Sequence, residues 1–498
     1  MSALPRFDDA LAATPAPAPL TIAVAEGDGI GPEIMAATLD VLRALDPSLN
    51  FLPLTVGLSA YRDGHAAGLG PEVFEAIDQH RVLLKGPITT PQGGGYKSVN
   101  VTLRKTLGLY ANVRPCVSYA PYVRSLQPGM DVVIVRENEE DTYAGIEHRQ
   151  TDEVVQCLKL ITRPGCERIV RHAFEYARAN GRRSVTCMSK DNIMKLTDGL
   201  FHKVFDEIAA EYPQLESEHR IIDIGTARIA ARPNDFDVVV TPNLYGDILS
   251  DVAAEVAGSI GLAGSSNIGP NCAMFEAVHG SAPDIAGQDL ANPSGLLLSA
   301  VMMLVHLGRA RPATDIHNAW LCALEDGLHT ADIYREGRSR QQLGTQAFAE
   351  AVIARLGQRP RQLAAVDYPD QPAAKLQVVK GAARVRADKQ LEGVDVFLHW
   401  DEAGRDPQVL GQQLTALAGP ECSLRLITNR GVKVFPQGHP GTFCTDHWRC
   451  RFLLAEGADR RALPALLLRI AEAGLDAIKT ENLYRFDGER GYSLAQGE

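Results

Sequence analysis

Short apolar runs alternate with amphipathic stretches between residues 20 and 358. The runs have the length of buried strands, and they predict strands at 81–87, 130–138, 183–190, 220–225 and 236–243. Apolar residues at helical spacing predict a helix at 165–181 and another at 336–357, which closes this part of the chain. Alternating strands and helices are typical of an α/β protein.

Residues 20–45 predict a strand, a glycine turn and a helix, the order that opens a dinucleotide-binding Rossmann unit. The fingerprint G-x-G-x-x-G is incomplete, however, because Gly27 and Gly29 are followed at the third glycine position by Pro32. We therefore interpret the segment as a tight turn in which Pro32 starts the helix.

Beyond residue 375 the pattern becomes that of a smaller unit. Runs at 393–400, 423–429, 431–436 and 447–456 predict strands, and the segments 406–419 and 461–474 predict helices. This order predicts an α+β ferredoxin-like domain at 375–498. A segment rich in proline and glutamine precedes it, which predicts a linker at 359–374.

Composition limits the classes of function. A chain of 498 residues with 45% hydrophobic residues can form two or three domains, each with its own core. The formal net charge of −11 argues against a nucleic-acid partner, and no apolar stretch is long enough to span a membrane. Residues 1–19 are rich in alanine and proline and lack an apolar core, so we expect a disordered tail rather than a targeting peptide.

The nine cysteines form no C-x-x-C pair and lie among apolar runs, which favours reduced thiols and a cytoplasmic location. Cys444, His447 and Cys450 are three residues apart, and with His439 they could bind zinc. We favour the alternative, in which 447–456 is a strand and its cysteine is a small core residue.

Two aspartates follow the strand at 236–243, in the sequence NLYGDILSD. If this sequence begins a helix, Asp247 and Asp251 lie on one face and repel each other. A salt bridge to an arginine, the amides at the helix start or a metal ion could each compensate for the repulsion. The pair by itself favours the first two explanations.

Further polar residues follow other predicted strands. Arg104 and Arg114 suit a substrate with several carboxylates, because a guanidinium group binds a carboxylate through two hydrogen bonds. Taken alone, such arginines more often form surface salt bridges. Lys190 ends a predicted strand, where it could act as a general base, and residues 93–95 are glycines that predict a mobile loop. The polar candidates are Ser98, Asn100, Arg104, Arg114, Arg136, Tyr143, Lys190 and Asn192.

Several long motifs between about residues 20 and 358 resemble the decarboxylating dehydrogenase family of isocitrate and isopropylmalate dehydrogenases. The resemblance implies the fold of that family, which has a large and a small α/β domain and is not a Rossmann fold. It implies a large, cofactor-binding domain at 20–109 and 258–358, and a small domain at 110–142 and 163–257 that holds substrate, metal and dimer contacts. Residues 143–162 would form the clasp region.

The G-D-x-x-S-D motif of the family binds Mg²⁺ or Mn²⁺, so the resemblance implies that Asp247 and Asp251 are metal ligands. Asp223 fits the place of a third ligand, which the other subunit of a homo-oligomer supplies. The sequence SVNVTLR is similar to isocitrate dehydrogenases, in which Ser98 and Asn100 would bind the γ-carboxylate of isocitrate. Arg104, Arg114 and Arg136 would bind its other carboxylates.

The loop H-G-[ST]-A-P binds the adenosine half of the cofactor in this family. NADP-dependent members usually continue with Lys-Tyr, whereas this chain has Asp284 and Ile285. A carboxylate at that place would accept hydrogen bonds from ribose hydroxyls and repel a 2′-phosphate, so we expect NAD. The implied cofactor-binding residues are Thr89, Asn192, Glu276, His279, Gly280, Ser281, Ala282, Asp284, Ile285 and Asn292.

The implied reaction is oxidation of isocitrate at C2 followed by loss of carbon dioxide to give 2-oxoglutarate. Lys190, or an aspartate such as Asp247 linked to it through water, would take the hydroxyl proton, and Tyr143 would protonate the enol. Alternatives are a dehydrogenase for homoisocitrate, isopropylmalate or tartrate, a non-catalytic regulatory subunit, and a metal-dependent hydrolase.

The C-terminal domain resembles the extension of long bacterial isocitrate dehydrogenases. We expect this domain to mediate subunit contacts, and the alternative is that it holds an effector site.

Overall fold

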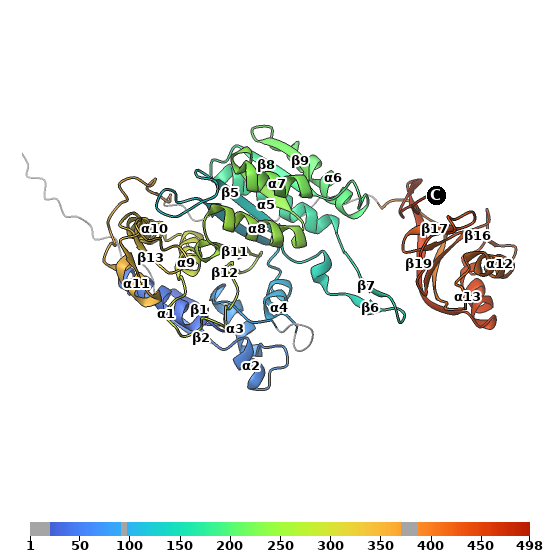
Figure 1. The fold of residues 1–498 in the computed structure, drawn as a ribbon, viewed down its shortest axis with the longest axis horizontal. Coiled ribbons are helices and arrows are strands. Elements are labelled where there is room, and N and C mark those ends of the chain that lie inside the picture. The colour runs from blue at the N-terminus through green and yellow to red at the C-terminus, as the bar shows by residue number, and fades with distance from the viewer. Residues whose placement is uncertain (1–19, 91–96, 370–385) are drawn as a thin grey trace, which may run out of the picture.

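The computed structural model describes residues 20–90, 97–369 and 386–498 (Figure 1). Residues 20–369 are built on one ten-stranded sheet, in the order β2-β1-β3-β12-β11-β4-β5-β10-β8-β9. Its strands are β1 Leu20–Ala25, β2 Leu49–Leu54, β3 Val82–Lys85, β4 Ala111–Val117, β5 Asp131–Glu137, β8 Ser184–Ser189, β9 Glu216–Ile221, β10 Val238–Thr241, β11 Gly264–Ile268 and β12 Ala273–Ala277. The sheet is mostly parallel, but β11 and β4 run antiparallel to their neighbours.

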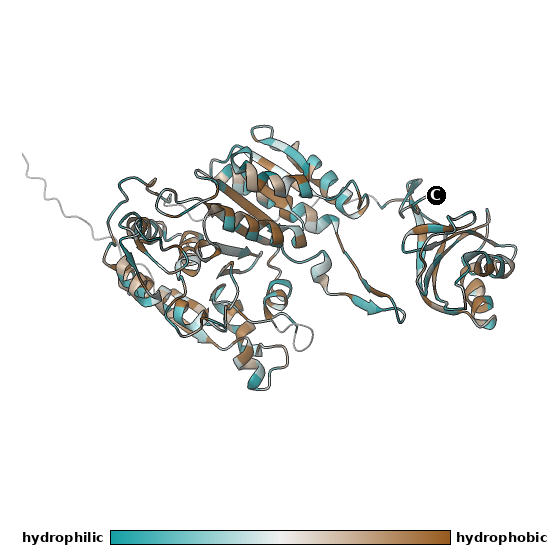
Figure 2. Ribbon diagram, in the orientation of Figure 1, coloured by the Kyte–Doolittle hydropathy of each residue, from teal (hydrophilic) through white to brown (hydrophobic). Residues whose placement is uncertain are grey.

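Helices cover both faces of this sheet (Figure 1). The longer ones are α1 Gly31–Leu45, α3 Pro71–His80, α4 Val99–Thr106, α5 Arg163–Ala179, α6 Thr197–Ala209, α7 Ile222–Ala231, α8 Asn243–Ala257, α9 Ser294–His306, α10 Ala310–Glu325 and α11 Thr345–Ile353, and a short α2 spans Leu58–Arg62. Figure 2 shows apolar residues concentrated on the strands and the helix faces that pack on them. The α/β class predicted from the alternation of strands and helices is confirmed.

Residues 386–498 form a second sheet, in the order β17-β16-β18-β15-β19-β20, with two helices packed on it. The elements are β15 Lys389–His399, α12 Pro407–Leu417, β16 Cys422–Asn429, β17 Val432–Phe435, β18 His447–Leu454, α13 Ala462–Glu472, β19 Asp476–Phe486 and β20 Glu489–Arg490. The sheet is antiparallel throughout, and its four long strands have the order of a ferredoxin-like domain. The α+β prediction is confirmed.

A hairpin joins the two parts of the molecule. Strands β6 (Glu147–Arg149) and β7 (Val155–Cys157) project toward the second sheet (Figure 1). At its tip, Thr151 donates a 2.6 Å hydrogen bond to the Asp446 carboxylate, and Glu153 accepts two hydrogen bonds from Arg405. Among the described residues, the hairpin thus contacts the C-terminal domain. The predicted role of that domain in subunit contacts stays a prediction.

Two sequence-based boundaries are wrong. The strand expected at 220–225 ends at Ile221, and α7 begins at Ile222 because Gly225 and Ile229 pack inward at helical spacing. The helix expected at 336–357 is restricted to α11, since Gly337 has a left-handed φ of 74° and Gly344 caps the helix start.

Part of the predicted linker packs on α10. Val366 exchanges hydrogen bonds of 2.8 and 2.9 Å with the Asn318 amide, and the Tyr368 hydroxyl lies 2.8 Å from His317 Nδ1. The expected tail at 1–19, the glycine loop at 93–95 and linker residues 370–374 lie outside the described residues. The predicted domain limits stay predictions.

All nine cysteines are free, and Cys450 is fully buried in the core of the C-terminal domain. The interpretation of Cys450 as a small core residue is confirmed. Among the described helices, none is both long enough and apolar enough to cross a membrane.

One buried histidine makes stability depend on pH. Burial lowers the pKa of His172 on α5 from 6.5 to about 4, whereas in the unfolded chain it binds a proton near pH 6.5. The unfolded state therefore binds more protons as the pH falls through this range, and the folded state loses stability. At about pH 5 the loss amounts to about 2 kcal/mol.

We therefore expect His172→Phe to lose less thermal stability than the wild type between about pH 8 and about pH 5, measured as the change in Tm. His148 is exposed on β6, so His148→Phe should follow the wild type and serves as the control. Equal acid-induced losses of Tm in wild type and His172→Phe would contradict the assignment.

Candidate active site

The two aspartates of the opening motif lie on α8, which begins two residues after β10 ends. Asp247 and Asp251 are one helical turn apart, with side chains that are 37% and 55% exposed. Strand β5, which carries Arg136, pairs with β10, and β4, which carries Arg114, pairs with β5. Two arginines from neighbouring strands therefore face the start of the helix that carries both aspartates.

Three side chains converge on Asp247. Arg136 Nη1 donates to Asp247 Oδ1, while the other nitrogens of the same guanidinium donate to the Asn243 side chain at 2.8 and 3.0 Å. The Tyr143 hydroxyl donates to Asp247 Oδ2 at 2.5 Å. Arg114 Nη1 lies 3.4 Å from Asp247 and 3.6 Å from Asp251. The salt bridge that the sequence left open for the aspartates is thus present.

Burial and charge set the ionisation of this group. Burial opposes ionisation of Asp247, but Arg136 and Arg114 outweigh it and lower the pKa of its carboxyl. Burial raises the pKa of Asp251, partly against the effect of Arg114. Burial also lowers the pKa of Arg136 to about 9, and the neighbouring Arg114 and Arg104 add to this. The site therefore gathers three arginines, and the two aspartates balance only part of their positive charge.

A second ion-pair network lies beside the first. Glu276 on β12 is buried and accepts from Lys85 Nζ at 2.7 Å, from Arg104 Nη2 at 2.9 Å and from Asn267 Nδ2 at 2.8 Å. Burial works against the Glu276 carboxylate, but the two cations hold its pKa well below its usual range. The sequence suggested a cofactor contact for Glu276, and the structure places its carboxylate among protein partners.

Three buried polar atoms of the predicted site lack a hydrogen-bond partner among the described residues. They are Asn100 Oδ1, Arg104 Nε and His279 Nε2. These three atoms therefore have hydrogen-bonding capacity that no described residue uses. Rotation of the Asn100 amide exchanges its oxygen and nitrogen, so this residue can also present a donor.

The predicted cofactor loop packs against the glycine turn that follows β1. The Ile30 amide donates to Ser281 O at 2.9 Å, and a Cβ on Gly29 would lie 2.0 Å from that oxygen, so only glycine fits there. The Ser281 hydroxyl is 2.7 Å from the Thr89 hydroxyl. The first turn thus has a structural function, consistent with our rejection of a Rossmann fingerprint.

The remaining cofactor candidates have different surroundings. Asp284 is exposed and its backbone oxygen accepts from Gln288, while Ile285 packs on the core. Asn292 is buried and donates to Asp332 at 3.0 Å. Gly280 and Ala282 belong to the same loop, in which Ala282 has a positive φ of 36°. Ser98 caps the start of α4 by accepting from the Val101 amide at 3.4 Å.

Lys190 and Asp223 form a pair of their own. Lys190 Nζ lies 2.7 Å from Asp223 Oδ1, and Asn192 is exposed in the same loop. Within the described part of one chain, Asp223, Asp247 and Asp251 do not come close enough to share a metal ion. The sequence-based expectation, in which a second copy supplies Lys190 and Asp223, stays a prediction.

Comparison with known proteins identifies the family. Residues 21–352 match the model of the isocitrate/isopropylmalate dehydrogenase family. The chain belongs to this family. Residues 389–498 match the C-terminal domain of bacterial isocitrate dehydrogenase.

Full-length relatives share both parts. An isocitrate dehydrogenase [NADP] of Rickettsia bellii is 52% identical over 476 residues, covering 95% of this chain and 98% of the relative. That of Thermus thermophilus is 45% identical over 483 residues, covering 95% of each. A crystal structure of a Thermus thermophilus protein superposes with a TM-score of 0.89 at 44% identity and covers 96% of both chains. The family fold predicted from the motifs is confirmed.

The expectation of NAD is wrong, because these full-length relatives of the isocitrate/isopropylmalate dehydrogenase family are named as NADP enzymes. The physical reason lies in the exposure of Asp284. Repulsion between an exposed carboxylate and a phosphate is screened by water and salt, to about 1 kcal/mol at about 4 Å. Such a residue is too weak to exclude a phosphate by itself.

The structure shows two further residues at the candidate site, Lys85 and Asn243, that the sequence analysis did not identify. Lys85 ends the buried strand β3 and is itself fully buried, and Asn243 holds two nitrogens of Arg136. A lysine within the apolar run RVLLKGP was the available signal for Lys85, since a buried cation requires a carboxylate partner. No local signal indicated Asn243.

The buried pair predicts a specific stability effect. Glu276→Gln removes the carboxylate that the buried Lys85 and Arg104 share, so we expect the protein to lose about 3 kcal/mol of stability or more. Adding Lys85→Met should restore part of it, because one of the two uncompensated cations is then removed while Arg104 remains. Thermal unfolding of the two single variants and the double variant measures the coupling, and additive losses would contradict the pairing.

Proposed function

We propose that this protein catalyses the oxidative decarboxylation of isocitrate to 2-oxoglutarate and carbon dioxide, with NADP as the hydride acceptor. The convergence of Arg114, Arg136 and Tyr143 on Asp247 carries this proposal, since it occurs in a chain that matches isocitrate dehydrogenases along its length. The cofactor proposal follows the NADP enzymes to which the chain is similar.

The substrate site has an excess of cations suited to a tricarboxylate. Arg104, Arg114 and Arg136 would bind its carboxylates, and Arg104 Nε has a hydrogen bond still to donate among the described residues. Ser98 and Asn100 start α4 near this group and would bind the γ-carboxylate. A polar pair of this kind favours isocitrate over substrates with an alkyl group, because it would be unsatisfied beside an alkyl chain.

The acidic residues fit a hard divalent cation. Asp247 and Asp251 offer carboxylate oxygens on one partly exposed face of α8, and Asp223 offers another on α7, a donor set suited to Mg²⁺ or Mn²⁺. We assign these three residues as the ligands, with Asp223 from a second copy of the chain. When bound, the cation supplies Lewis acidity toward the substrate oxygens.

Exposed apolar side chains support a second copy at this surface. Ile193 and Leu196 follow the Lys190 loop, Ile224 is next to Asp223, and Ile248 is next to Asp247; they are between 49% and 69% exposed. Exposed apolar residues gathered around polar functional residues are characteristic of protein contacts. A homo-oligomer would bury them and bring Lys190 and Asp223 to Asp247 of another copy.

Two residues have the properties needed for proton transfer. Lys190 would take the proton of the C2 hydroxyl, and its pairing with Asp223 fixes the position of its amine. Burial and the nearby Asp247 raise the pKa of Tyr143, against the opposing effect of Arg136, so its hydroxyl stays protonated. Tyr143 can therefore deliver a proton to the enol carbon, while Arg136 stabilises the negative charge of the enolate.

A coupled assay of the purified protein tests the activity. Isocitrate with Mg²⁺ or Mn²⁺ should produce reduced nucleotide, detected by its absorbance, with a higher kcat/KM for NADP than for NAD. Homoisocitrate, isopropylmalate and tartrate should each give a much lower kcat/KM. Absence of turnover with isocitrate under all nucleotide and metal combinations would overturn the proposal.

Sharing of the site between copies has its own test. Lys190→Met and Asp251→Asn should each be inactive, but mixed subunits should regain about a quarter of the wild-type activity, because half of randomly formed dimers are hybrids with one intact site. Mixing Lys190→Met with Asp223→Asn should restore nothing, since every site of such a hybrid contains one defect. Equal results from the two mixtures would rule out the shared site.

A further inference from the structure

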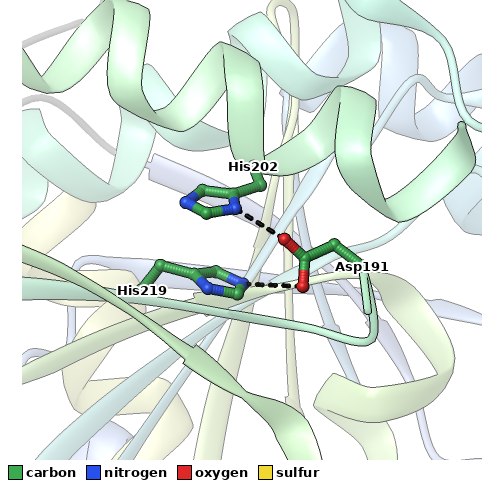
Figure 3. A group of neighbouring side chains, drawn as sticks. All are labelled: Asp191, His202 and His219. Carbon is green, nitrogen blue, oxygen red and sulfur yellow. Dashed lines mark hydrogen bonds and ion pairs between the residues drawn. The ribbon is translucent and has the colours of Figure 1, made fainter. Parts of the chain in front are cut away.

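A second polar cluster lies between three neighbouring elements of the large sheet region. Asp191 follows β8, His202 lies on α6, and His219 lies on β9, which pairs in parallel with β8 (Figure 3). His202 Nδ1 is 2.7 Å from one oxygen of Asp191, and His219 Nε2 is 3.8 Å from the other. The two imidazole rings are stacked, with centroids 3.6 Å apart and planes inclined by 15°.

The cluster brings together three side chains that could bind one metal ion. One nitrogen of each histidine and one oxygen of Asp191 lie within 4.8 Å of one another, and no other described group of this kind does. Around a tetrahedral zinc ion, ligand atoms lie about 3.3 Å apart, given metal–ligand distances of about 2.0 to 2.1 Å. Because the lone pair of an imidazole nitrogen lies in the ring plane, the two stacked rings would also have to turn about their side-chain bonds until both lone pairs point to one ion.

The surroundings also fit metal binding. Burial and the adjacent His202 lower the pKa of His219, and the two histidines outweigh burial to lower the pKa of Asp191. A neutral imidazole and an ionised carboxylate are the forms that bind a metal. Asp206 lies 3.6 Å from His202 Nε2, on the side away from Asp191, where a carboxylate orients a metal-binding histidine.

We propose that Asp191, His202 and His219 form a binding site for a divalent transition metal such as Zn²⁺, with water completing its coordination. Two nitrogens and one oxygen suit Zn²⁺, Co²⁺ or Ni²⁺ rather than Mg²⁺, so this site differs in chemistry from the all-carboxylate group at α8. The side chains are 13% to 28% exposed, which leaves a path for the ion to enter. The Ser189 hydroxyl, now 2.9 Å from His219 Nε2, can rotate away from that nitrogen.

Such an ion would connect two segments that lie close in sequence to Lys190 and Asp223. Asp191 directly follows Lys190, and His219 precedes Asp223 by four residues. A metal at this position would link α6, β9 and the loop after β8, so Zn²⁺ should raise the Tm of the folded protein.

Calorimetric titration of the full-length protein with Zn²⁺ tests the site, with excess Mg²⁺ present to occupy the carboxylate group on α8. We expect one Zn²⁺ per chain to bind at this cluster in the wild type, and His202→Gln and His219→Gln to weaken that binding by more than tenfold. Asp206→Asn, which removes the orienting carboxylate, should weaken it by about tenfold. His148→Gln changes an exposed histidine elsewhere and should bind as the wild type does.

Unchanged Zn²⁺ affinity in the two histidine variants, or no binding by the wild type, would overturn the proposal. A second measurement does not depend on any variant folding. Anomalous scattering at the zinc edge from wild-type crystals grown with Zn²⁺ should show a peak between Asp191, His202 and His219. Its absence there in zinc-loaded crystals would equally overturn the site.

Discussion

Arg114 and Arg136 are cations held inside the protein, and the Asp247 carboxylate lies between them. A buried guanidinium group is tolerated only when a carboxylate and hydrogen-bond acceptors surround it, so these contacts require β4, β5 and the start of α8 to stay together. The same constraint brings the Tyr143 hydroxyl to Asp247. The residues proposed to bind substrate are therefore also those that fix the local structure.

The neighbouring network around Glu276 follows the same rule. Lys85 and Arg104 share one buried carboxylate, and Arg104 Nε has no hydrogen-bond partner among the described residues. Both networks thus hold arginine nitrogens in position before any ligand arrives. Preorganised donors of this kind bind carboxylates without the cost of reorganising the site, which suits the proposed tricarboxylate substrate.

The expectation of NAD failed because it was based on a single carboxylate, Asp284, which is exposed. Asp284 was interpreted from its identity and its place in a loop, and its exposure was not visible in the sequence. Selection against a 2′-phosphate depends on the charges that the whole fold brings to the ribose, and one screened carboxylate contributes little. Motif reasoning was successful where the motif itself determines the geometry, as at Gly29, where a side chain would collide with Ser281.

The sequence by itself determined strands β3, β5, β8 and β10, the ferredoxin-like order of the C-terminal domain and the placement of Asp247 and Asp251 on one helix face. These features follow from periodicity over a few residues, which is a local property. Only the tertiary structure decided that Arg136 meets an aspartate 111 residues away, and that Asp191, His202 and His219 gather at one point. Those contacts depend on the order of strands in the sheet. The polar pattern of a single segment does not indicate which distant residues it will contact.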